Sequence, residues 1–531
     1  MKRIPHQLME LNSTFIWHWP WFIQGVKSAK QHGFTGIILH QQELLSILAT
    51  PSPLSLKLNV ENLIHQQNYA LQYLKRVDCY LAENNLSFWL QGEAAPSDDI
   101  IKRKFPELAF DEKSAPDFWQ HFYAAIFSPL LPALPHLSGV VLGLTTPAFQ
   151  TAGWQQGLYS VWSQLRSFGK KLVLRDFIDD SWPRQQLATV LSSLPDDVRA
   201  AVKATEIDYH PGFANHPHIV ALPGHKKWIE YDLVGTGYGW TALPCYLADE
   251  ISGRLSWAIS ATGNEVEAIT SRVSWQWMPD SRVMDSANSI NLLGLMAANQ
   301  TTDGATLSVF DRWAEQRQLR FRAIQDRQRL ASLFYSSYDW LCKTPNLLGR
   351  RLHYQSQVPD SVSQAQQVLH MDTRSANWLQ AWQPLIPADD PAQGQEQRQL
   401  IRLEKEAACF LAANAVQTLR EIMPRITCPD DSLELLFAAW RNAEVYSQMF
   451  SRVTSAMVDL LWRDRYGDDS LPADVLIQHQ SQLLRYVDTL ERWLTSPPAG
   501  SPLFLPLLLS PQRLARFARS LTESEYTQHK K

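Results

Sequence analysis

The sequence predicts an α/β fold: a TIM-type (β/α)8 barrel over residues 1–310, followed by an all-helical C-terminal domain over residues 311–531. Short apolar, β-branched runs alternate with longer amphipathic runs through the first 300 or so residues, and strand patterns disappear after Ser308. Eight strand–helix units in about 300 residues match the size of such a barrel. The length of 531 residues also favours two or three domains over one core.

The strand candidates are near-continuous apolar runs such as TGIILH, SGVVLGL and KLVL, which are typical of strands buried on both faces of a parallel sheet. They are Thr14–Trp19, Thr35–His40, Ser87–Gln91, Gly139–Leu144, Lys171–Phe177, Ala201–Ile207, Lys227–Val234 and Glu267–Ser274. Amphipathic stretches, for example Asn59–Glu83 and Phe118–Leu131, are the predicted helices between them. A doubly wound sheet is the alternative. It would place a glycine-rich phosphate turn after an early strand, and the run WHWPWF cannot form one.

Helical periodicity dominates the C-terminal part of the chain. The clearest helices are Asp311–Leu341, Glu396–Ile422, Ser432–Leu461, Val475–Leu494 and Pro511–Leu521. Their Trp- and Leu-rich faces indicate a packed core, and they leave open a homodimer formed through this domain.

Composition argues against several classes of protein. A net charge of −4 and a pI near 6.4 provide no basic field for nucleic acid. The five cysteines are scattered without a CxxC pair, which fits neither a disulfide framework nor a zinc site and suits a reducing compartment. The N-terminus lacks the apolar core of a secretory signal, and no apolar run is long enough to span a membrane. We therefore expect a cytoplasmic protein with no nucleic-acid or membrane partner, no cofactor and no metal.

Tryptophan is unusually common, with 20 residues. Indole planes in an open cleft can stack on the apolar C–H faces of sugar rings, and Trp17, Trp19 and Trp240 lie near predicted strand ends. For any single tryptophan a core or interface role is the simpler interpretation. The set as a whole favours sugar binding.

Chemistry in a barrel of this kind takes place at the C-terminal ends of the strands. The predicted ends carry carboxylates, cations, histidines and amides: His18, His40, Gln91, Glu93, Arg175, Asp176, Lys203, Asp208, His210, Glu230, Asp232 and Arg272. Neither GxSxG nor HExxH occurs, which disfavours acyl transfer and zinc hydrolysis. Carboxylates on opposite sides of a cleft are what glycoside hydrolysis needs.

Arg175 and Lys203 fall on neighbouring predicted strands and would place two positive charges in one pocket. Such a pocket suits an anionic group such as the carboxylate of a uronic acid, which arginine can hold in a bidentate fashion. The alternative interpretation is that the two cations only neutralise Asp176 and Asp208. The sequence leaves both open.

Residues 201–251, which begin AVKATEIDYHPGF and end CYLADEI, resemble a stretch of the α-glucuronidases of glycoside hydrolase family 67. In that family a VK-containing strand is followed by a strand that opens on a glutamate and then by a CYLAP segment. LVLRDF at 172–177 is similar to the family's fifth-strand run, and Asp285–Trp313 to its last barrel helix and the element after it. The resemblance covers about residues 135–315 and implies O-glycosyl hydrolysis of uronic-acid-bearing oligosaccharides.

The resemblance also implies roles for single residues. Asp208 falls on a carboxylate that activates water, and Lys203 and Arg175 fall on cations that hold the uronate carboxylate. Glu230 matches the glutamate that opens the seventh-strand motif, which is not the family's second basic carboxylate. Asp208 and Glu230 are the leading candidates for the catalytic carboxylates. The candidate substrate-binding residues are Arg175, Lys203, Asp176, His210, Trp17, Trp19, Trp240 and Arg272.

The chain departs from the family pattern at several places. The family's second basic carboxylate falls on Thr236, its acid glutamate on Thr146 or Pro147, and a neighbouring lysine on Gly143. Its N-terminal β domain has no counterpart here. Two hypotheses follow: a glycoside hydrolase, or a catalytically inactive relative that binds sugar acids in the same pocket. A metal-dependent enzyme is a third, and it would need a cage such as Asp208, His210 and Glu230.

Overall fold

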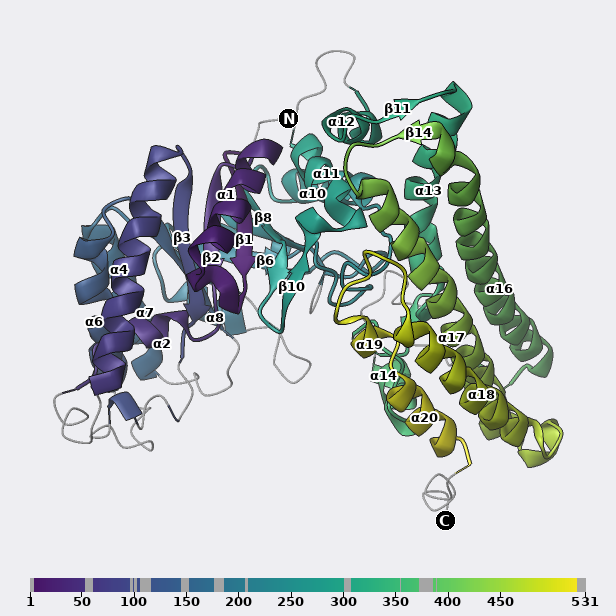
Figure 1. Ribbon diagram of the computed structural model, residues 1–531. Coiled ribbons are helices and arrows are strands. Elements are labelled where there is room, and N and C mark those ends of the chain that lie inside the picture. Colours follow the sequence, from purple (N-terminus) through teal and green to yellow (C-terminus); the bar gives the residue numbers. More distant parts are fainter. Residues whose placement is uncertain are drawn as a thin grey trace.

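The computed structural model describes residues 4–52, 61–95, 99, 103–105, 116–144, 152–175, 186–205, 209–299, 307–353, 355–371, 385–387 and 389–522. Eight parallel strands close into a barrel in chain order, which confirms the predicted (β/α)8 fold (Figure 1). The strands are β1 (His6–Asn12), β2 (Gly36–His40), β3 (Ser87–Glu93), β4 (Leu137–Gly143), β5 (Lys171–Arg175), β6 (Arg199–Lys203), β7 (Lys227–Asp232) and β8 (Val266–Arg272).

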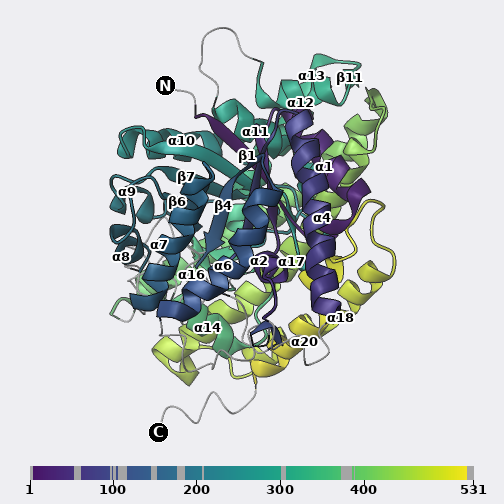
Figure 2. The ribbon, with the colours of Figure 1, turned by 90° about the vertical axis from the view of Figure 1, so that its left-hand side faces the viewer.

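Helices form the outer layer of the barrel. They are α1 (Trp19–His32), α2 (Leu44–Leu48), α4 (Glu61–Glu83), α6 (Pro116–Ala133), α7 (Ala152–Ser167), α8 (Gln186–Ser192), α9 (His218–Ala221), α10 (Ala248–Ala261) and α11 (Ile290–Ala298). Figure 2 shows α1, α4, α6 and α7 covering the strands on one side. Outward strand residues such as Met9, Leu11 and Ile37 belong to the large core beneath these helices.

The predicted first strand, Thr14–Trp19, is wrong. Thr14–Trp17 forms a 3-10 helix, η1, and α1 begins at Trp19, while the real strand β1 comes earlier. Ser13 caps η1 by accepting a hydrogen bond from the backbone N–H of Phe15, and Pro20 in the first turn of α1 favours a helix start. The aromatic run resembles a buried strand, but these local signals make it helical.

The barrel interior is layered, because alternate residues of a strand point to the same side. Each strand contributes one residue to an apolar layer: Leu8, Ile38, Trp89, Val141, Val173, Ala201, Trp228 and Ala268. Two and four residues further along, towards the C-terminal ends, the same faces carry polar side chains. We call this set the polar layer: Glu10, His40, Gln91, Glu93, Arg175, Lys203, Glu230, Asp232, Thr270 and Arg272. The apolar layer is therefore the floor beneath a charged mouth.

The C-terminal part of the chain is helical, as predicted. Its helices are α12 (Val309–Gln316), α13 (Ile324–Lys343), α14 (Val362–Met371), α16 (Pro391–Ile422), α17 (Ser432–Tyr466), α18 (Val475–Thr495), α19 (Leu505–Leu508) and α20 (Pro511–Ser520). The long helices α16 and α17 lie side by side (Figure 1). Two small two-stranded sheets interrupt the helices, which the sequence did not predict: β11 (Arg320–Phe321) with β14 (Ile426–Thr427), and the hairpin of β12 (Asn346–Leu347) with β13 (Arg350–Arg351). Across the described ranges, every helix is too short or too polar to span a lipid bilayer.

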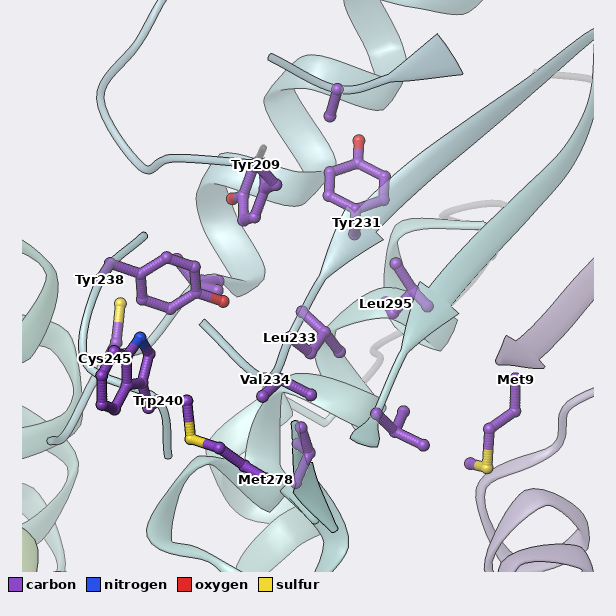
Figure 3. Packing of buried hydrophobic residues seen from close by; sticks show 14 of the residues in the cluster. Met9, Tyr209, Tyr231, Leu233, Val234, Tyr238, Trp240, Cys245, Met278 and Leu295 are labelled. Atoms are coloured by element: carbon purple, nitrogen blue, oxygen red, sulfur yellow. The ribbon is translucent and has the colours of Figure 1, made fainter. Parts of the chain in front are cut away.

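The helical region packs against the segments that follow β6 and β7, at the C-terminal end of the barrel. The backbone N–H of Tyr246 donates to Oγ of Ser337 on α13 at 2.8 Å. The ring of Trp240 lies 5.9 Å from that of Phe504. Figure 3 shows Trp240 among Tyr238, Cys245 and Met278 in this packed zone. The helical region thus packs against the segment that follows β7.

Candidate functional site

The first ion pair of the polar layer joins Arg175 on β5 to Glu230 on β7. The guanidinium Nε of Arg175 lies 2.8 Å from each carboxylate oxygen of Glu230, and both side chains are buried. Because β6 lies between β5 and β7, the pair reaches past Lys203 on that strand. The two residues that the sequence assigned to binding and to catalysis are therefore bonded to one another.

The second ion pair joins Arg272 on β8 to Asp232 on β7, with Nη2 and Oδ2 2.7 Å apart. Asp232 also accepts hydrogen bonds from the hydroxyl of Thr236 at 2.6 Å and from its backbone N–H at 3.1 Å. Burial by itself raises the pKa of Asp232, but Arg272 and the Thr236 hydrogen bonds outweigh it and hold the pKa below its usual value. Asp232 is thus a fixed anion that anchors the turn containing Thr236.

A third pair joins Glu10 on β1 to His40 on β2, with Oε1 and Nδ1 2.6 Å apart. Burial alone raises the pKa of Glu10, but the adjacent His40, together with Arg175 and Arg272, lowers it to about 2. Glu10 is therefore an ionised carboxylate at neutral pH, buried in the polar layer.

Sequence reasoning missed Glu10 because it placed the first strand too late. The run HQLMELN contains the signal that could have found it. Apolar Met9 and Leu11 alternate with Leu8, Glu10 and Asn12, as in a strand whose inner face becomes polar toward one end.

Lys203 occupies the centre of this charge distribution, since it is the register partner of Glu230 and is buried. Burial lowers its pKa well below the usual value. Arg175 and Arg272 lower it further by repulsion, and Glu230 and Asp232 offset only part of the effect. An anion brought into the polar layer would favour the protonated ammonium. Three cationic side chains, Arg175, Lys203 and Arg272, thus share one buried layer with the carboxylates of Glu10, Glu230 and Asp232.

Glu93 is a half-buried carboxylate at the end of β3, beside Gly143 on β4. A Cβ atom at position 143 would lie 2.8 Å from Oε1 of Glu93, closer than such atoms approach. The glycine therefore leaves room for the Glu93 carboxylate against the β4 backbone. The family that the sequence resembles has a lysine at the position of Gly143. This chain therefore lacks that positive charge at the end of β4.

Several candidates from the sequence lie outside the described residues: Asp208, Asp176, Thr146 and Pro147. Their roles stay predictions. His210 is described and buried, and its backbone N–H donates to Oγ1 of Thr205 at 2.8 Å. Its ring stacks on Phe213 with centroids 4.1 Å apart. His210 is thus held within the segment that follows β6.

The three candidate tryptophans have different surroundings. Trp240 is 2% exposed and donates its indole N–H to the carbonyl of Thr236 at 2.7 Å, so it offers no free face to a sugar. Trp19 lies on α1, with the guanidinium of Arg76 3.6 Å from its ring centroid. Trp17 is partly exposed, donates to Oε1 of Gln41 at 2.7 Å, and lines a pocket. Trp17 therefore has the setting expected of a ligand-binding indole.

Metal chemistry has no visible support in the part of the chain that the structure describes. No three side chains of His, Cys, Asp or Glu gather there closely enough to hold an ion. The proposed cage included Asp208, which lies outside that part.

Comparison with known proteins yields structural similarity alone. No family model matches the sequence, and no curated protein matches it. A GH138 enzyme targeting pectin rhamnogalacturonan II superposes with a TM-score of 0.66 at 10% identity, over 97% of this chain and 65% of that one. This chain thus spans just under two thirds of that enzyme's length. The match supports the barrel and the helical region as one shared architecture.

Two further structures superpose more loosely. A GH115 4-O-methyl-α-glucuronidase with specificity for decorated arabinogalactans has a TM-score of 0.47 at 10% identity, over 98% of this chain and 61% of that one. A β-N-acetylhexosaminidase from Bacteroides fragilis has a TM-score of 0.40 at 10% identity, over 60% of this chain and 70% of that one. With TM-scores below 0.5, neither match bears on function.

Proposed function

We propose that this chain is a glycoside hydrolase that acts on uronic-acid-bearing oligosaccharides through the polar layer. The observation that carries the proposal is the convergence of Arg175, Lys203 and Arg272 in one buried site, where burial and the two arginines disfavour the charge on Lys203 and an additional anion would favour it. A uronate carboxylate would supply that anion and accept charge-assisted hydrogen bonds. The architecture shared with a pectin-directed GH138 enzyme is in keeping with such a substrate.

Each carboxylate of the site would have a separate role in the proposed reaction. The oxocarbenium-like transition state of glycoside hydrolysis carries positive charge, which an ionised carboxylate stabilises. Glu10, with its depressed pKa, fits that role or the role of a base, whereas a general acid must carry a proton. Glu93 is our candidate for the acid because it is half-buried at the mouth. Asp208 remains the candidate that the family resemblance implies for activating water.

Glu230 receives a different role from the one predicted. Both of its carboxylate oxygens accept from Nε of Arg175, so it is already engaged with a cation. We assign Glu230 to positioning Arg175 toward the substrate carboxylate. Its replacement by glutamine should therefore weaken binding of the sugar acid more than it lowers kcat.

Calorimetric binding of glucuronate, galacturonate and glucose tests the proposal. The parent protein should bind a uronate at least tenfold more tightly than glucose, and Lys203→Met should remove that preference while the protein stays folded. The matched control is Lys171→Met, because Lys171 lies at the opposite end of the barrel, at the start of β5. Equal affinity of the parent for uronates and glucose would overturn the proposal.

The second candidate function is sugar-acid binding without hydrolysis. It is favoured by one observation: Glu230 and Asp232 are both committed to ion pairs with arginines. A survey of turnover on aryl uronides and uronic-acid oligosaccharides separates the two functions. Selective binding of uronates with no hydrolysis of any of these substrates would establish the second.

A further inference from the structure

A pocket of about 440 Å³ lies between η1, α2 and α4, separate from the polar layer. Its lining includes the aromatic rings of Trp17 and Tyr69 and the polar side chains of Glu43, Gln66 and Arg103. A volume of this size is typical of small-molecule sites, which combine apolar walls with a few polar groups. The residues that line the pocket indicate which class of ligand it would bind.

We propose that this pocket is a subsite for a second sugar residue of the oligosaccharide whose acidic residue occupies the polar layer. The proposal rests on the function proposed above and extends it from one sugar to a chain. Its ligand class is a neutral or acidic pyranose, bound through ring stacking and hydroxyl hydrogen bonds.

The aromatic rings provide the stacking surface. The hydrogen bond from Trp17 to Gln41 and a ring contact with Tyr73, at a centroid distance of 5.5 Å, hold the indole in place. Tyr69 is 64% exposed on α4, so its ring is available to a ligand. An indole held in advance loses little conformational entropy on binding, which favours affinity.

The polar residues supply partners for sugar hydroxyls. Glu43 accepts hydrogen bonds, Arg103 donates them and Gln66 can do both. Lys104 forms a rigid wall, since its ammonium donates to the carbonyls of Ser46, Ile47 and Ala49 at 2.6 to 2.9 Å. A purely apolar ligand would desolvate these polar groups without pairing them, which is costly.

The pocket lies at the same end of the barrel as the polar layer. Gln41, which holds Trp17, directly follows His40, the partner of Glu10. The next residue, Gln42, donates its backbone N–H to Oε1 of Gln276 at 3.1 Å. Beside Gln276, Trp277 is 68% exposed on the turn between β9 (Ser274–Trp275) and β10 (Met278–Arg282). One more exposed aromatic ring, that of Trp277, therefore follows a residue that contacts the segment after β2.

Chain-length dependence of binding tests the subsite, with galacturonic acid and its dimer and trimer as probes. In the parent the longer chains should bind more tightly than the monomer. Tyr69→Ala should weaken trimer binding about three- to tenfold, the usual worth of one aromatic contact, and leave monomer binding unchanged. Because the side chain of Tyr69 is exposed, Tyr69→Ala should keep the fold, and circular dichroism checks this. The matched control, Tyr159→Ala, removes a half-exposed tyrosine from α7 and should change neither affinity.

The outcomes separate the two proposals. If the monomer binds but the trimer binds no more tightly, or if Tyr69→Ala and Tyr159→Ala behave alike, the subsite is overturned and the proposed function stands. If galacturonate and glucuronate do not bind, yet a neutral trisaccharide binds in a manner that depends on Tyr69, the pocket binds sugar but the acidic-sugar function falls, and with it the subsite's place beside an acidic residue.

Discussion

Glu10 is a buried carboxylate that the sequence analysis did not identify. It is buried beside His40 and interacts with Arg175 and Arg272. Burial without partners would neutralise a carboxyl group, but His40 and the two arginines lower its pKa and keep it ionised. Its buried negative charge contributes to stability, and under the proposed function it would also stabilise the transition state.

Replacing Glu10 with glutamine tests both consequences. We expect Glu10→Gln to lower kcat on a uronic-acid substrate by about 10²-fold or more, as removal of a charge that stabilises the transition state does. Because the pKa of Glu10 is depressed to about 2 from 4.5, the unfolded chain binds more protons between these values. The stabilisation is complete above about pH 4.5 and is lost as the pH falls toward 2.

Melting temperature measured against pH for the parent and Glu10→Gln checks the second consequence. The parent should lose stability more steeply than the variant below pH 4.5. Glu267→Gln, at the N-terminal end of the barrel, is the control for kcat. Parallel melting curves on the acid side, or a fall in kcat no larger than in the control, would count against the role of Glu10.

The strands were the most predictable elements. The predicted second to eighth strands overlap β2 to β8, because apolar runs buried on both faces have a clear pattern. Arg175, Lys203, Glu230 and Arg272 therefore reach the polar layer as strand ends should. Their pairing was not predictable, because Arg175 bonds to Glu230 two strands away. Likewise β1 was missed because its inner face is polar and it is therefore not a continuous apolar run. The aromatic run after it was predicted as the first strand instead.

Strand β4 offers a prediction about two glycines. At Gly143 a Cβ would meet the flexible end of Glu93, whereas at Gly139 it would lie 2.3 Å from the backbone oxygen of Lys171. We expect Gly143→Ala to leave the melting temperature within a few degrees of the parent's, while displacing the Glu93 carboxylate and lowering kcat. Gly139→Ala should destabilise the fold strongly, because a neighbouring strand must move. Thermal melts and kcat measurements check this; equal stability of the two variants would contradict it.

The helical region is expected to be an independent domain. We propose a boundary near residue 310, and the structure shows that α12 begins slightly earlier, at Val309. Phe310 and Trp313 of α12 pack against Phe334 of α13, so α12 belongs with the helical part. A fragment of residues 307–531 should fold as a helical unit by circular dichroism. Substantial β-structure in that spectrum, or an unfolded fragment, would refute this partition.

Self-association through the helical region also has a structural candidate. Leu400, Leu403 and Phe410 on α16 are 47%, 47% and 70% exposed, and their spacing places them along one face of the helix. We expect a homodimer that buries this face, and Phe410→Ser should shift it to the monomer. Light scattering coupled to size exclusion measures the mass. Exposed Leu503, at 82%, provides the control variant Leu503→Ser. A monomeric parent would rule out the dimer.

The interlocked charges of the polar layer constrain how such a protein can evolve. Arg175 and Glu230 share one buried ion pair, and Arg272 and Asp232 share another. A mutation that removes one member leaves its partner buried and unpaired, which lowers the stability of the fold by several kcal/mol. Descendants that change the ligand should therefore replace both members of a pair together, or recruit a new counter-ion for the survivor. Related proteins would then differ from one another by both members of an ion pair at once. Positions at which both members are replaced together would mark a change of substrate.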